Sequence, residues 1–164
     1  MNNSVPLLTI DFSLQSGTWP DQSEMAGLLD KTLSTASSHC PFDLPTGAEV
    51  SVVFCDDVNI QILNNEFRDE DKPTNVLSFA SNDHVELEAW SPLLGDIILA
   101  QETIEREAKE QSKTFTDHLT HLLVHGYLHL VGYDHMNDED AEKMENMERK
   151  VLAALGIADP YVEA

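Results

Sequence analysis

Segments whose apolar residues alternate, or recur every three to four positions, predict strands and helices along most of the chain. Strands are predicted over 5–12, 49–55 and 76–79, and a further strand over 93–100 is interrupted by Gly95 and Asp96. Helices are predicted over 21–38, from Asp56 or Asp57 to Asn65, over 101–113 and 115–131, and from Asn137 to a stop at Gly156. The polar segments 67–75 and 81–92 are predicted to be irregular. This order favours a single α+β domain over residues 1–164, with a mixed, mostly parallel sheet of about four strands and about five helices packed on it.

The charge balance of the chain is strongly acidic. Nine lysine and arginine residues stand against thirty aspartate and glutamate residues, which gives a formal net charge of -21. Such a surface repels nucleic acid, so a polyanionic substrate would need a local concentration of cations or a partner that delivers it. A solvated acidic surface with no such role is the alternative interpretation.

The cysteines and the first residues bear on the compartment. Cys40 and Cys55 are too far apart for a Cys-x-x-Cys site, and we expect both to be buried or partly buried thiols in a reducing compartment. The start of the chain carries no basic side chain, and no apolar run approaches the length of a membrane span. A cytoplasmic protein that does not engage a membrane is therefore expected.

Histidines are concentrated in the helix predicted over 115–131 and just after it. Five of the seven lie between His118 and His135, and three of these form the frame His-Gly-x-x-His-x-x-Gly-x-x-His. Residues four apart share one face of a helix, so His125 and His129 can bind the same tetrahedral Zn²⁺. Gly132 allows the positive φ that ends a helix and returns His135 to the metal. The pattern predicts a zincin-like metal helix with one Zn²⁺ per chain and a fourth position open to water.

The same helical stripe offers a second pair of histidines. His121 and His125 are also four residues apart, but six residues after His125 there is a valine, whereas six residues after His129 there is His135. The metal is therefore assigned to His125, His129 and His135. A polar surface position for His118, and a packing or metal-supporting role for His121, are alternatives to function.

The position of the first glycine in the frame argues against peptide hydrolysis. In His-Glu-x-x-His enzymes, the glutamate takes a proton from the water on the metal. Here that position is Gly126, which has no side chain. A reaction that mainly demands charge stabilisation, such as phosphodiester cleavage, suits the site better.

Few other side chains offer chemistry. Phosphodiester cleavage would need a cation near the developing charge, and Arg68 is the conspicuous candidate, although a surface ion pair with Glu66 or Asp69 is the simpler interpretation of the sequence. Asp134 either orients a ligand imidazole or serves in the turn. Asp96 is either a buried carboxylate that needs a partner or a residue of a turn or edge.

The histidine frame over 125–135 resembles the signature of the YbeY family of bacterial rRNA maturation endoribonucleases. Segments 67–79 and 94–97 and the tail over 144–161 resemble that family as well, in the same order, so that the resemblance covers most of the chain from about Ser51 onward. One position departs from the family pattern Pro-Thr-Asp-Val-Leu-Ser-Phe, because Asn75 stands in place of the aspartate. This change removes a charge beside the expected substrate groove.

The resemblance implies a zinc-dependent, single-strand-selective endoribonuclease that acts in 16S rRNA 3′-end maturation and ribosome quality control. It places zinc on His125, His129 and His135, which makes His125 part of the catalytic centre. It also implies that Arg68 neutralises the negative charge that develops in the transition state. It also implies rRNA and the ribosome as partners, together with ribosomal proteins and an assembly GTPase. The side chains proposed to contact the RNA backbone are Lys72, Lys109, Lys113 and His121.

Two other functions compete with this interpretation. A zinc metallopeptidase would fit the spacing of the histidines, and Gly126 is the feature against it. A non-catalytic ribosome assembly factor could use the same histidines as a scaffold. The nucleophile of a nuclease stays open between water and the ribose 2′-hydroxyl.

Overall fold

The strands and helices follow one another in the predicted order. The computed structural model describes residues 8–40 and 43–161, so residues 5–7 of the first predicted strand lie outside the described part. The elements are β1 (Thr9–Leu14), α1 (Gln22–His39), β2 (Glu49–Cys55), α2 (Asp57–Arg68), β3 (Val76–Ala80), the short 3₁₀ helix η1 (Leu87–Ala89), β4 (Leu93–Ala100), α3 (Gln101–Glu110), α4 (Phe115–Leu130) and α5 (Asp138–Ala154).

Side-chain caps fix where most of the helices begin. The predicted caps Asp21 and Asn137 accept hydrogen bonds from the backbone N–H three residues ahead, and of the two candidates for α2 it is Asp56 that does so. The end of α2 differs from the prediction, because the helix continues past Asn65 to Arg68 and stops only where Asp69 adopts the left-handed conformation with a φ of 57°. Phe67 and Arg68 are therefore helical rather than irregular.

The sheet is mixed and mostly parallel, as predicted. Its strand order is β1-β2-β4-β3, in which β1, β2 and β4 run parallel and β3 pairs with β4 in the antiparallel sense at one edge. Gly95 does not break β4. Instead the pairing of β4 with β2 shifts its register beside Gly95, whose φ is +144°, and a Cβ at that glycine would lie 2.1 Å from the carbonyl oxygen of Phe79.

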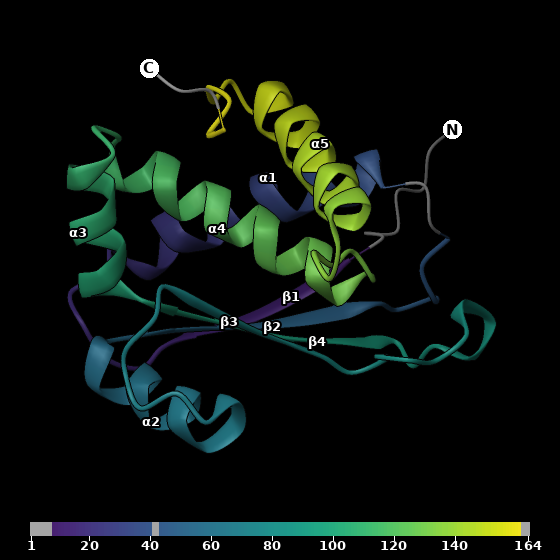
Figure 1. Ribbon diagram of the computed structural model, residues 1–164, viewed down its shortest axis with the longest axis horizontal. Helices are drawn as coiled ribbons and strands as arrows, with labels where there is room; N and C mark the ends of the chain where they lie inside the picture. The colour runs from purple at the N-terminus through teal and green to yellow at the C-terminus, as the bar shows by residue number, and fades with distance from the viewer. Residues whose placement is uncertain (1–7, 41–42, 162–164) are drawn as a thin grey trace.

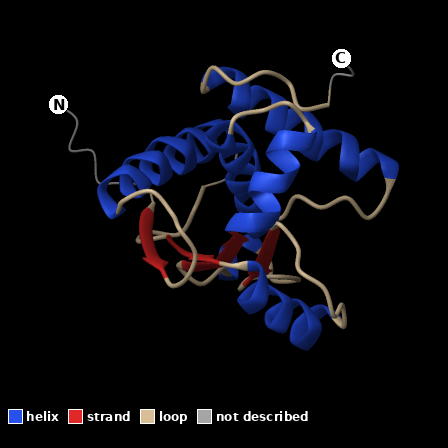
Figure 2. Ribbon diagram, turned by 90° about the vertical axis from the view of Figure 1, so that its left-hand side faces the viewer, coloured by secondary structure: helices blue, strands red, loops and turns tan. Residues whose placement is uncertain are grey.

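The helices form two unequal layers. Figure 1 shows α1, α3, α4 and α5 on one side of the sheet and α2 on the other, and Figure 2 shows the same separation from the side. Helix α4 lies at the centre of the larger layer, where it contacts β3, β4, α1, α3 and α5. Within the described residues, no helix combines the length and the apolar character needed to cross a membrane.

Both cysteines are unpaired thiols, as expected. Cys55 is buried and Cys40 is partly buried. Burial raises the pKa of each thiol to about 11, so both stay protonated at neutral pH.

The contact between α4 and the sheet is close at Gly126. A Cβ on this glycine would lie 3.0 Å from Cγ2 of Ile97 and 3.0 Å from Oγ of Ser78. Ile97 is completely buried and β-branched, so it has little freedom to move aside. The glycine of the histidine frame is therefore a packing requirement in its own right.

Substituting Gly126→Ala tests this contact. The added methyl group overpacks the boundary between α4 and the sheet, and we expect the free energy of unfolding to fall by about 1–2 kcal/mol. Gly27→Ala is the matched control, because Gly27 is an exposed glycine within α1 whose added Cβ would meet no atom within 4 Å. In the control, the free energy of unfolding should rise by about 0.5–1 kcal/mol, because alanine has the higher helix propensity. Urea denaturation monitored by circular dichroism measures both, and equal gains in the two variants would contradict the packing role.

Candidate metal centre

Four histidines run along one stripe of α4, and their surroundings differ. His118 is almost completely buried, with 3% of its surface exposed, and its Nε2 lies 2.9 Å from Oε1 of Glu107. The surface position considered for His118 is therefore wrong, because α3 packs over this part of α4 and supplies a carboxylate partner. His121 is also withdrawn from solvent, and its Nε2 lies 2.7 Å from Oε1 of Glu148 on α5.

His125 and His129 face each other with the geometry of two ligands of one metal ion. Their Nε2 atoms are 3.2 Å apart. Two nitrogens bound at 2.0–2.1 Å to a tetrahedral Zn²⁺ would be separated by roughly 3.3 Å. The residues present therefore fit a zinc ion on this pair without rearrangement of α4.

The turn after α4 brings two more potential ligands to this pair. Gly132 has a φ of +103°, and the N–H of Tyr133 donates to the carbonyl of Leu128, which closes the helix and reverses the chain. One ligand atom each of His129, Asp134 and His135 lies within 4.8 Å of the others. The carboxylate of Asp134 also accepts a hydrogen bond from the N–H of His135 at 2.8 Å. Asp134 thus has a turn role and stands close enough to be a ligand.

Burial prepares His129 to bind a cation. Burial, followed by the charges of His125 and His135, lowers the pKa of His129 to about 4. The imidazole of His129 is therefore neutral at physiological pH and presents a lone pair, as a metal ligand must.

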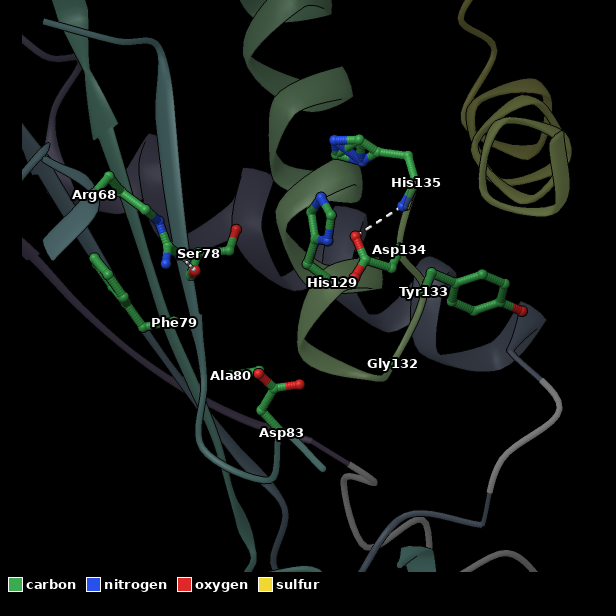
Figure 3. Close-up of a pocket in the computed structure, with 10 residues that line it drawn as sticks. All are labelled: Arg68, Ser78, Phe79, Ala80, Asp83, His129, Gly132, Tyr133, Asp134 and His135. Atoms are coloured by element: carbon green, nitrogen blue, oxygen red, sulfur yellow. Dashed lines mark hydrogen bonds between the residues drawn. The ribbon is translucent and has the colours of Figure 1, made fainter. Parts of the chain in front are cut away.

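His129 and His135 lie on one wall of a cleft of about 490 Å³, and Arg68 lies on the opposite wall. Figure 3 shows Arg68, Ser78 and Phe79 on one side and His129, Asp134 and His135 on the other. The remaining residues that line the cleft are Ala80, Asp83, Gly132 and Tyr133. The cleft is therefore bounded by β3, by the end of α2 and by the turn that follows α4.

The contacts of Arg68 hold its guanidinium beside the cleft. One guanidinium nitrogen donates to the carbonyl of Ser78 at 2.8 Å, and the group lies over the ring of Phe79 at 4.9 Å. Within the described residues, Arg68 forms no ion pair with Glu66 or Asp69, so the simpler interpretation of the sequence is wrong. The reason is that α2 extends to Arg68 and carries it to the edge strand β3.

A buried carboxylate on α5 supports the histidines and was missed from the sequence. Glu148 is 1% exposed and lies 3.3 Å from Nδ1 of His125 as well as close to His121. Burial would raise the pKa of Glu148, but the hydrogen bonds from His121 and His125 outweigh it and lower that pKa to about 2. Its spacing offered a signal, because Glu148 falls between Met144 and Val151 on the apolar face of α5.

The other candidate residues lie away from this cleft. Lys72 is exposed and pairs with Glu70 at 3.6 Å. Lys113 and His121 line a separate cavity of about 70 Å³ beside the C-terminal tail. Neither the two lysines nor His121 is among the residues that line the cleft of Arg68 and His129.

Asn75 and Asp96 have structural roles or positions outside the cleft. The side chain of Asn75 donates to Oε1 of Glu107 at 2.9 Å, so it joins β3 to α3 rather than lining the cleft. An aspartate at this position would place two carboxylates in contact, which the amide avoids. Asp96 is half-buried within β4, between β2 and β3, and so is neither a turn residue nor an edge residue.

Comparison with known proteins agrees with this arrangement. The chain is 48% identical over 159 residues to the endoribonuclease YbeY of Allorhizobium ampelinum, a match that covers 94% of this chain and 95% of that protein. It is 50% identical over 161 residues to the endoribonuclease YbeY of Sinorhizobium fredii, with 94% and 92% covered.

A solved structure and a family model complete the comparison. The solution structure of a Thermotoga maritima protein superposes with a TM-score of 0.55 at 25% identity, and the match covers 94% of this chain and all of that one. A sequence model of the family described as endoribonuclease YbeY matches residues 11–156. This match includes Arg68 and every candidate metal ligand. The chain therefore belongs to the endoribonuclease YbeY family.

Proposed function

We propose that this chain is a zinc-dependent endoribonuclease that cuts single-stranded RNA in the cleft between the histidines and Arg68. The observation that carries the proposal is the placement of a guanidinium and a histidine cluster on opposite walls of one cleft. A phosphate bound between them would meet a metal on one side and a fixed positive charge on the other. The names of the curated relatives supply the substrate class.

The main residues of the proposed site then have definite tasks. His125, His129 and His135 would hold the metal, and Asp134 would either join them or keep His135 in place. When bound, the metal supplies Lewis-acid chemistry to the reacting phosphate. Arg68 binds a non-bridging oxygen of that phosphate, and its contacts with Ser78 and Phe79 limit the freedom of the guanidinium.

The substrate that we propose is the 3′ end of 16S rRNA within the ribosome. Arg68 is the one cation among the residues that line the cleft, and Asp83 and Asp134 line it too. With a net charge of -21, the protein should bind free RNA weakly. Delivery by ribosomal proteins or an assembly GTPase, which the family resemblance suggests, would offset this repulsion.

The structure also bears on the peptidase alternative. A Cβ at position 126 would lie 3.0 Å from both Cγ2 of Ile97 and Oγ of Ser78, so a glutamate there would press against the sheet. The close packing of α4 therefore disfavours, at that position, the base that a His-Glu-x-x-His peptidase requires. Phosphodiester cleavage remains the function that the cleft supports best.

The first test of this proposal asks which residues hold the metal. We expect about one Zn²⁺ per chain in the wild type, and His125→Ala or His129→Ala should weaken binding by more than about 100-fold because each removes a ligand. Asp134→Asn should lower the zinc affinity by about tenfold or less if Asp134 only supports His135. Competition with a chromophoric chelator measures these affinities, and His39→Ala, at the exposed end of α1, is the control. A larger loss in Asp134→Asn than in His125→Ala would replace His125 by Asp134 in the ligand set.

The second test separates a nuclease from a non-catalytic assembly factor. Arg68→Ala should lower the cleavage rate of single-stranded RNA by about 100- to 1000-fold, because it removes the positive charge that faces the transition state. Zinc content should not change, since Arg68 touches no proposed ligand. Lys31→Ala is the matched control, because Lys31 is exposed on α1 and does not line the cleft, and its rate should stay within about twofold.

The readout for this test is a labelled 16S rRNA 3′-end fragment, assayed alone and with ribosomes, with and without a chelator. Cleavage that depends on zinc and on Arg68 is the expected result. A wild type that binds zinc but cuts RNA under neither condition would leave only the role of an assembly factor.

A further inference from the structure

The carboxylate of Glu148 lies at the meeting point of α4, α5 and the C-terminal tail. It is 1% exposed, and it receives three hydrogen bonds from side chains. Oε1 lies 2.7 Å from Nε2 of His121 and 2.8 Å from the hydroxyl of Tyr161, and Oε2 lies 3.3 Å from Nδ1 of His125. A carboxylate this deeply buried is costly unless its oxygens are well satisfied, and here they are.

The three hydrogen bonds fix where the protons are. An ionised carboxylate can only accept, so His121, His125 and Tyr161 must all donate to it. In His125 the donor is Nδ1, which leaves the lone pair of the neutral ring on Nε2. That Nε2 is the atom that faces Nε2 of His129 at 3.2 Å. Glu148 therefore selects the tautomer of His125 that can bind a metal between the two rings.

The C-terminal tail supplies the third hydrogen bond to Glu148. After α5 the chain turns back above α4 in Figure 1. Nε of Arg149 donates to Asp159 at 3.0 Å, the guanidinium of Arg149 lies over the ring of Tyr161 at 5.3 Å, and the backbone N–H of Tyr161 donates to Asp159 at 2.8 Å. These contacts bring the hydroxyl of Tyr161 to Glu148, and its ring packs edge-on against His121.

We propose that Glu148 is a positioning residue for the metal ligand His125, and that Tyr161 of the C-terminal tail holds Glu148 in the orientation this task requires. The inference rests on the ligand set of the proposed function. To that set it adds a chain of contacts that links the tail to the metal ligand. Tyr161 binds Glu148, Glu148 binds Nδ1 of His125, and Nε2 of the same ring would bind the metal. The tail then serves the active centre although it contributes no ligand.

The experiment compares Glu148→Gln and Tyr161→Phe with the wild type. A glutamine amide can donate as well as accept, so it no longer dictates the proton position on His125. We expect Zn²⁺ affinity to fall by about 10- to 100-fold in Glu148→Gln. Tyr161→Phe keeps the ring and removes one hydrogen bond to Glu148, so the Zn²⁺ affinity should fall by about threefold to tenfold. Glu142→Gln makes the same chemical change at an exposed position of α5 and should leave the affinity unchanged.

Two readouts besides activity distinguish positioning from a purely structural role. Zinc affinity is measured by chelator competition, and the tautomer of His125 is read in the metal-free protein from ¹⁵N chemical shifts of the neutral ring. The wild type should show the proton on Nδ1, and Glu148→Gln should show a mixture of tautomers. Urea denaturation reports the stability of each variant, and Tyr161→Phe provides the answer where Glu148→Gln does not fold.

The possible outcomes separate this inference from the proposed function. Wild-type protein that does not bind Zn²⁺ would overturn the metal centre and this inference together. Wild-type protein that binds Zn²⁺, with equal affinity and an unchanged His125 tautomer in the variants, would overturn only the positioning role. A loss of stability without a loss of affinity would likewise reduce Glu148 and Tyr161 to a structural link.

Discussion

The close packing of α4 against the sheet at Gly126 is the constraint on which the rest of the structure depends. Because the helix carries no side chain there, its backbone lies so close to Ile97 and Ser78 that a Cβ would be only 3.0 Å from each. This approach places one face of α4 in the core and brings His129 to the cleft beside β3, with His125 next to it. The same contact disfavours a glutamate at this position. The packing and the chemistry of the frame are thus linked.

The local parts of this arrangement could be predicted from the sequence, because local patterns determine them. Capping residues such as Asp21 and Asn137 mark the starts of helices within the span of one turn. The spacing of His125 and His129 is likewise a property of one helix, and Gly132 has the positive φ that the turn requires. The strand order and the antiparallel edge strand follow from contacts between distant segments, which the sequence pattern indicated only as a mixed sheet.

What the sequence did not reveal involves partners far apart in the chain. Arg68 appeared to belong to a local ion pair, and only the extension of α2 and its packing beside β3 bring it to the cleft. His118 appeared exposed because its partner Glu107 lies on another helix. Glu148 meets His121 and His125 only because α5 packs on α4. In each case the partner of the polar side chain lies on another helix or strand, which local sequence patterns do not indicate.

Burial sets the charge of several groups in and beside the cleft. The chain as a whole is strongly acidic, and the cleft holds Asp83 and Asp134 together with one guanidinium and a neutral imidazole, that of His129, whose pKa burial lowers to about 4. Glu148 is ionised although buried, since the hydrogen bonds from His121 and His125 outweigh its desolvation. The anion of Glu148 at Nδ1 of His125 increases the electron density on Nε2 of the same ring, which faces His129, and so favours binding of a cation there. The candidate metal centre therefore depends on three parts of the fold: α5 supplies the anion, α4 supplies His125 and His129, and the sheet holds α4 in register with Arg68.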